Sequence, residues 1–140
     1  MNGVVVIDKP SGRTSANVVA FLKKALQVGK IGHIGTLDPL ATGVLPICIG
    51  EATKLSDYLV AQEKEYTATA LLGVTTDTMD ITGKVTKQMD ITVLTEEGIK
   101  FAFAQMEGVI SQQVPIYSAV KQNGVPLYKL ARRGVAVEAP

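Results

Sequence analysis

The segment GHIGTLDPLATGVLP, residues 32–46, contributes most to the fold that this sequence predicts. Its first twelve residues contain three glycines and one proline, a composition that excludes a regular helix. We therefore expect a shaped loop over residues 32–43 and a buried strand over the aliphatic residues 44–49. The single cysteine, Cys48, lies in that strand. It has no partner for an internal disulfide, so we expect it to be a small core residue.

An aspartate stands near the centre of this loop. Pro39 fixes its own φ angle and pushes Asp38 towards extended conformations, while glycines allow a ligand to approach the backbone closely. A carboxylate presented in this way can act as a nucleophile or a general base. The same sequence also suits a turn in which the aspartate bonds to its own backbone. Local chemistry alone leaves both interpretations open.

Two phosphate-binding patterns do not fit the loop. A Walker-type cradle would end in Gly-Lys-Ser or Gly-Lys-Thr, and the loop has no such ending. A dinucleotide fingerprint needs a different glycine spacing and a helix that starts directly from the loop.

The residues before and after the loop predict short strands and helices. The run at residues 4–7 is rich in valine and predicts a buried strand. Thr14 or Ser15 can cap a following helix that ends at Gly29, and residues 52–60 predict another short helix. One face of the first helix forms an apolar stripe. The stripe consists of Val18, Leu22, Ala25 and Leu26.

The second half of the sequence predicts a similar mixture of elements. In chain order these are a strand over residues 64–73, a polar turn over 75–83, a returning strand over 84–87, a helix capped by Thr95 and running to Met106, a strand over 109–114 and a short basic helix over 127–133. No regular alternation of strand and helix appears. The fold class we expect is α+β, with a mixed, largely antiparallel sheet and flanking helices.

The composition is that of an ordinary globular domain, with 46% hydrophobic residues, 19% charged residues and a net charge of +1. No apolar run approaches the ~20 residues that span a bilayer, and the N-terminus does not resemble a signal peptide. We expect no membrane association and a reducing, cytoplasmic setting. One cysteine and one histidine are too few for a typical catalytic metal site, so we expect no metal.

The C-terminal segment is basic. From residue 109 onward Glu138 is the single acidic residue, against four positive residues. These are Lys121, Lys129, Arg132 and Arg133. The pattern fits either a solvated helix face or a contact with nucleic acid.

Residues 32–46, continuing into GEATK at residues 50–54, resemble the signature of the bacterial tRNA pseudouridine synthase family that modifies uridine 55 in the T loop. Further segments resemble motifs of that family in the same order, and together they span essentially the whole chain. They are DKPSG at residues 8–12 with Thr14 and Ser15, KEY at residues 64–66, TDT at residues 76–78 and PIYSAVK at residues 115–121.

The resemblance implies roles for individual residues. Asp38 stands where the family has its catalytic aspartate, and Tyr66 stands where a tyrosine packs against the flipped base and takes part in proton removal. His33 matches the histidine that helps hold the T loop. Lys9 either binds phosphate or braces the catalytic loop, and the role of Asp77 stays open. We expect the remaining RNA contacts from Lys64, Lys121, Lys129, Arg132 and Arg133.

Three further expectations follow from the resemblance. His33, Asp38 and Tyr66 should line one cleft, and the reaction should need no metal or organic cofactor. The fold should resemble a pseudouridine synthase catalytic domain that is incomplete at its C-terminus, with an RNA-gripping insertion over about residues 110–140. The family's later strands, their arginine and a C-terminal RNA-binding domain would lie beyond residue 140.

We therefore expect residues 1–140 to need a C-terminal half for turnover, supplied by the rest of the chain or by another polypeptide. One alternative is a non-catalytic RNA-binding fragment of the same ancestry. Another is a small-molecule hydrolase that uses Asp38 and His33.

Overall fold

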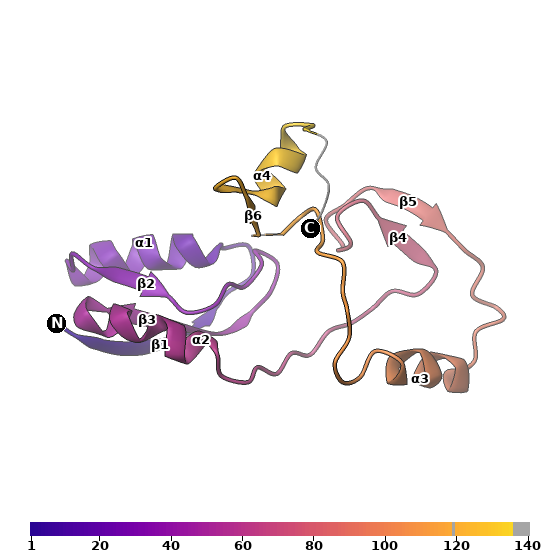
Figure 1. Ribbon diagram of the computed structural model, residues 1–140, viewed down its shortest axis with the longest axis horizontal. Helices are drawn as coiled ribbons and strands as arrows, with labels where there is room; N and C mark the ends of the chain where they lie inside the picture. Colours follow the sequence, from indigo (N-terminus) through magenta and orange to yellow (C-terminus); the bar gives the residue numbers. More distant parts are fainter. Residues whose placement is uncertain (119, 136–140) are drawn as a thin grey trace. The chain divides into compact units, whose positions relative to one another are not determined.

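The computed structural model describes residues 1–118 and 120–135. Ala119 and residues 136–140, which belong to the predicted insertion, lie outside the described residues. The chain divides into two compact units, Met1–Thr67 and Ala68–Pro140. Each unit combines short helices with antiparallel strands (Figure 1), so the expected α+β class is confirmed. The described strands form three small antiparallel sheets.

The first unit is built around a three-stranded sheet. Its strands are β1 (Gly3–Lys9), β2 (Ile31–His33) and β3 (Gly43–Ile49), in the order β1-β3-β2. The central strand β3 contains the most deeply buried hydrophobic residues of the unit, including Leu45, Ile47 and Cys48. The predicted buried strand and the core position of Cys48 are therefore confirmed.

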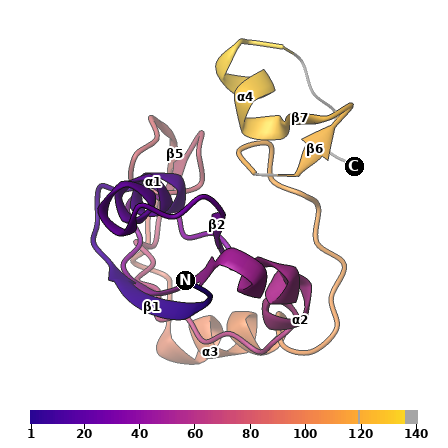
Figure 2. The same ribbon diagram turned by 90° about the vertical axis from the view of Figure 1, so that its left-hand side faces the viewer.

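Helix α1 (Ser15–Leu26) covers one face of this sheet (Figures 1 and 2). Leu45 and Ile47 of β3 form the hydrophobic core with Val18 of the helix. Val5 and Ile7 of β1 pack against this core, because they pair with Ile47 and Leu45 and share their face of the sheet.

The prediction that residues 4–7 form a buried strand is correct for the strand and wrong for the burial. Val4 is 49% exposed and Val6 is 61% exposed. β1 is an edge strand, and its side chains alternate between the two faces of the sheet. Only its alternate residues therefore reach the core beneath α1.

Helix α1 begins as predicted and ends earlier than predicted. Thr14 is the N-cap: its hydroxyl oxygen accepts the N–H of Asn17, and Asn17 accepts the N–H of Thr14. At the other end Gln27 adopts a left-handed conformation with a φ of 51° and closes the helix before Gly29. Ala25 and Leu26 are exposed, so only the first half of the predicted apolar stripe is used.

The helix predicted over residues 52–60 is present in two parts. A 3-10 helix, η1 (Gly50–Leu55), leads into a short α-helix, α2 (Ser56–Val60). None of the described helices has the length and apolarity that a membrane span requires.

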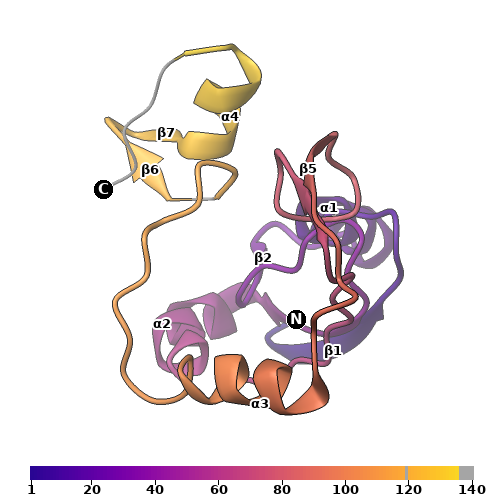
Figure 3. The same cartoon turned by 90° about the vertical axis from the view of Figure 1, so that its right-hand side faces the viewer.

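Within its described residues the second unit contains two hairpins and two helices, and its elements can be followed in Figure 3. In chain order they are β4 (Val74–Thr76), β5 (Val85–Gln88), α3 (Glu96–Ala104), β6 (Lys121–Gln122), β7 (Val125–Pro126) and α4 (Leu127–Arg132). The polar turn, its returning strand, the helix capped by Thr95 and the basic helix are all confirmed.

The aspartates of the β4–β5 turn bond within the turn itself. Asp77 accepts the N–H of Lys84 at 2.8 Å. Asp80 accepts hydrogen bonds from the Thr82 hydroxyl, the Thr78 hydroxyl and the Thr82 N–H. These bonds lower the pKa of Asp80 from its ordinary value, and the bond from the Thr82 hydroxyl group has the largest effect. Both aspartates therefore stabilise the turn through hydrogen bonds.

Two predicted strands are absent from the described residues. Residues 64–71 and 110–115 are extended or irregular chain without a ladder partner. A strand is stabilised by hydrogen bonds and side-chain pairs across a ladder, so an alternating pattern cannot form one alone. The predictions for residues 64–73 and 109–114 are thus wrong for the secondary structure of this chain.

Candidate active site

The candidate catalytic loop, residues 34–42, joins β2 to β3. The sequence placed Gly32 and His33 in this loop, but both belong to β2 because they pair with Cys48 and Ile47 of β3. The ladder continues into the loop, where the N–H of Ile34 donates to the carbonyl oxygen of Pro46 at 2.8 Å. Both ends of the loop are therefore fixed by the sheet.

On one side of Asp38 the loop is held by Ser15. The Ser15 hydroxyl group donates to the carbonyl oxygen of Leu37 at 3.2 Å and accepts the N–H of Leu37 at 3.1 Å. Ser15 is the first residue of α1 and is 2% exposed. The residue before Asp38 is thus bonded at both of its backbone polar groups.

On the other side the loop is held by Lys9, which is fully buried. Its ammonium group donates to the carbonyl oxygens of Pro10 at 3.0 Å, Arg13 at 2.7 Å and Pro39 at 3.3 Å. The N–H of Gly12 also donates to Pro39, at 2.7 Å. Three donors on three carbonyls leave no free proton on the ammonium group. Of the two roles expected for Lys9, this geometry favours bracing the loop.

Asp38 itself is exposed, and its carboxylate makes no hydrogen bond or ion pair within the described residues. Its backbone carbonyl accepts the N–H of Ala41 at 3.1 Å and so closes a turn. The turn is therefore closed by a main-chain hydrogen bond. The Asp38 side chain does not bond to its own backbone, as the interpretation of Asp38 as a turn residue required. The hydrogen-bonded backbone of the loop therefore presents the Asp38 carboxylate to solvent.

His33 lies at the end of β2, at the start of the same loop. Its Nδ1 is 2.6 Å from the carbonyl oxygen of Gly35. A carbonyl oxygen can only accept, so Nδ1 carries the proton. In the neutral ring Nε2 is then a hydrogen-bond acceptor, and it has no partner in the described part of the chain.

Tyr66 and Lys64 lie in chain without regular secondary structure. Tyr66 is 68% exposed, and no hydrogen bond joins it to Asp38 or His33 among the described residues. The ammonium group of Lys64 donates to the carbonyl oxygens of Val60 and Gln62. The cleft shared by His33, Asp38 and Tyr66 stays a prediction.

The basic residues gather in a hairpin and the helix that follows it. Lys121 lies in β6, Lys129 lies in α4, and both are exposed, as is Arg133 at the end of the helix. Arg132 also belongs to α4, but its side chain is not described. Leu127 is fully buried, and its N–H donates to Val120, which fixes the helix on the hairpin.

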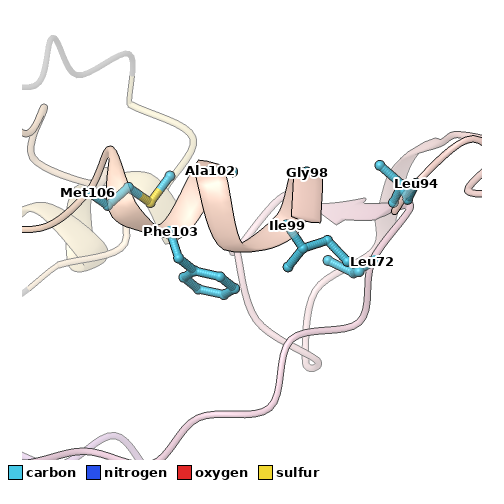
Figure 4. Close-up of a pocket in the computed structure, with 7 residues that line it drawn as sticks. All are labelled: Leu72, Leu94, Gly98, Ile99, Ala102, Phe103 and Met106. Atoms are coloured by element: carbon cyan, nitrogen blue, oxygen red, sulfur yellow. The ribbon is translucent and has the colours of Figure 1, made fainter. Parts of the chain in front are cut away.

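An apolar pocket lies beside α3 (Figure 4). It is lined by Leu72, Leu94, Gly98, Ile99, Ala102, Phe103 and Met106. None of these side chains can transfer a proton or attack a substrate, and no predicted site residue lies among them. The described residues also contain no cluster of three or more histidine, cysteine, aspartate or glutamate side chains that could hold a metal.

The family model for the TruB family pseudouridylate synthases (N-terminal domain) matches residues 23–140, which include the loop with Asp38. The chain belongs to this family.

Curated relatives agree with this assignment along the whole chain. The chain is 53% identical to a protein of Syntrophus aciditrophicus over 140 residues and 51% identical to one of Lactobacillus acidophilus over 141 residues. Both relatives are named tRNA pseudouridine synthase B. The matches cover all of this chain but only 45% and 48% of the two relatives. The chain therefore spans about half the length of these relatives.

A solved structure of a Cbf5-Nop10-Gar1 complex contains a chain of similar fold. The two chains are 33% identical, with a TM-score of 0.57, and the match covers 85% of this chain and 31% of the other. The pseudouridine-synthase-like fold expected from the sequence is thus confirmed, and the matching family model is that of the N-terminal domain.

Three residues that support the loop are not predicted by the sequence pattern. The pattern assigns Ser15 only to a helix cap, and it assigns no role to Ser11, whose hydroxyl group donates to the Leu40 carbonyl at 3.0 Å. The N–H of Gly12 is a backbone group and carries no side-chain signal. Of the three, only Ser15 carries a local signal of another role: Thr14 already caps the helix, so the neighbouring hydroxyl group of Ser15 is not needed for capping.

We predict that Lys9→Met lowers the free energy of unfolding by about 1–3 kcal/mol, because backbone carbonyls around the loop lose a charged donor. Lys24→Met serves as the control, since Lys24 is exposed on α1, and its effect should stay within about 0.5 kcal/mol. Urea unfolding of the two variants measures the difference. Equal stabilities would show that the brace does not contribute.

Proposed function

We propose that this chain supplies the aspartate-bearing part of a tRNA pseudouridine synthase that converts the T-loop uridine at position 55 to pseudouridine. Membership of the TruB family and the names of the relatives support a tRNA pseudouridine synthase. The observation that carries the proposal furthest is the free, exposed carboxylate of Asp38 on a loop that is bonded on both sides.

The proposed reaction needs the target base to leave its stack. A stacked uridine hides the carbons at which bonds change, so the nucleotide is flipped outward at a cost of a few kcal/mol. Stacking on an aromatic ring returns about 1–3 kcal/mol of that cost. Tyr66 is the aromatic residue proposed for this contact, and its segment has no ladder that would hold it elsewhere.

In the chemical step Asp38 attacks the flipped uracil or its ribose as a nucleophile. The glycosidic C–N bond breaks, the base turns, and a C–C bond forms between its C5 and the ribose. The bond to Asp38 also breaks, which restores the free carboxylate. The C5 proton leaves with the participation of Tyr66, and N1 carries a proton in the product. No electrons are exchanged with an external acceptor, so the reaction is an isomerisation.

His33 is proposed to hold the T loop from the start of the Asp38 loop. With Nδ1 bonded to Gly35, the neutral ring offers Nε2 as an acceptor for an N–H or O–H of the RNA. The basic hairpin–helix segment is proposed to bind phosphates, which gives affinity without sequence preference. The shape of the T loop then selects the site.

We propose that turnover also needs the part of the relatives' sequences that lies outside their match to this chain. We predict that residues 1–140 alone form no pseudouridine in unmodified tRNA. A chimera that continues residue 140 with the remaining sequence of the Syntrophus aciditrophicus relative should be active, because a site with missing walls aligns its substrate poorly, and misalignment costs about 100-fold. Multiple turnovers by residues 1–140 alone would contradict the prediction, and an inactive chimera that binds tRNA would favour the non-catalytic alternative.

A second prediction concerns the basic segment. Replacing its four cations, Lys121, Lys129, Arg132 and Arg133, by glutamine should weaken binding to every tRNA. The log–log dependence of affinity on salt should also flatten, by about 0.7–0.9 for each phosphate contact that is lost. A matched control removes four exposed lysines outside this segment: Lys23, Lys24, Lys84 and Lys87. If both variants show the same salt slope as the unmodified chain, the basic segment is merely solvated.

A further inference from the structure

The hydroxyl group of Ser15 is buried and is not needed by its own helix. Thr14 caps α1, since its hydroxyl oxygen accepts the N–H of Asn17 at 3.0 Å. Ser15 follows as the first helical residue, and its side chain points to the catalytic loop instead. A buried hydroxyl group costs free energy unless it is hydrogen-bonded, so its partners define its function.

Both partners belong to one residue of the loop. Ser15 bonds to the N–H and to the carbonyl oxygen of Leu37, at 3.1 Å and 3.2 Å. That carbonyl oxygen is part of the planar peptide unit that ends at the Cα of Asp38. Fixing this peptide unit fixes the point from which the Asp38 side chain starts.

The Asp38 carboxylate has no partner of its own in the described residues, so only its backbone can aim it. After Asp38 the backbone is fixed by Pro39, whose ring restricts φ and whose carbonyl oxygen is bonded by Lys9 and Gly12. Before Asp38 the corresponding restraint comes from Ser15. Without it one of the two peptide units next to the aspartate would be free to turn.

We infer that Ser15 is a positioning residue for Asp38, which acts by holding the two peptide units on either side of the Leu37 Cα, the second of which ends at the Cα of Asp38. This inference rests on the proposed function, because it matters to turnover only if the Asp38 carboxylate is the reacting group. It assigns Ser15 no contact with RNA. Loss of the hydroxyl group should therefore slow the chemical step and leave binding in place.

The kinetic test uses the active chimera. Ser15→Ala should lower kcat by about 10- to 100-fold, because small errors in alignment are costly, while the Kd for tRNA changes by less than about twofold. Ser15→Thr keeps the hydroxyl group and should recover most of kcat. Thr14→Ala is the matched control: it removes the neighbouring hydroxyl, weakens the helix cap and should leave kcat near that of the parent. A kcat for Ser15→Ala equal to that of Thr14→Ala would overturn the inference.

Amide hydrogen exchange in the 140-residue chain tests the restraint without any activity. The Leu37 amide should exchange at least about 10-fold faster in Ser15→Ala, with exchange in β3 unchanged. Ser15→Cys has nearly the size of serine and weaker hydrogen bonds, so it should give an intermediate rate and covers the case in which Ser15→Ala does not fold. Unchanged exchange at Leu37 would overturn the inference even if the chimera is active. An inactive parent chimera with faster exchange at Leu37 would instead contradict the proposed function.

Discussion

The ammonium group of Lys9 lies where β1, the turn after it and the loop with Asp38 meet. A buried charge is costly unless hydrogen bonds replace the lost water, and here three backbone carbonyl oxygens do so. Because every partner is a main-chain group, the interaction fixes the course of the backbone. The position of Asp38 therefore depends on the position of β1 in the sheet.

The register of the sheet brings Lys9 to this place. Val5 and Ile7 lie on the core face because they pair with Ile47 and Leu45, and the same register sets Lys9 opposite Gly43, where the loop enters β3. A shift of one residue would move Lys9 to the other face and expose the two apolar side chains. Hydrophobic burial thus determines where the brace forms, and the brace with Ser15 determines where Asp38 stands.

The parts of the fold that depend on local sequence were predictable. The glycines and proline around Asp38 predicted a shaped loop, and Thr14, Thr95 and the aliphatic run of β3 predicted two helix starts and the central strand. The strands predicted over residues 64–73 and 109–114 depend on partners elsewhere, so their alternating pattern was not sufficient. Resemblance, and not periodicity, identified Asp38 as the catalytic candidate.

The supports of the loop were harder to predict because they are long-range hydrogen bonds. Ser15 bonds across 22 residues to Leu37, and Lys9 bonds across 30 residues to Pro39. A serine at a helix start and a lysine at the end of a strand have ordinary local explanations. Their hydrogen bonds to the loop with Asp38 are visible only in the folded chain. Tyr66 lies in a segment that pairs with no described strand, so its stacking against the flipped base stays a proposal.

Pseudouridine formation by Asp38→Asn in the active chimera tests whether the Asp38 carboxylate is the reacting group. Asparagine keeps the shape of the side chain and the backbone restraints and removes the nucleophilic charge. Turnover should be lost in this variant while tRNA binding is largely kept. Pseudouridine formation at a near-parent rate would show that the Asp38 carboxylate is not the nucleophile.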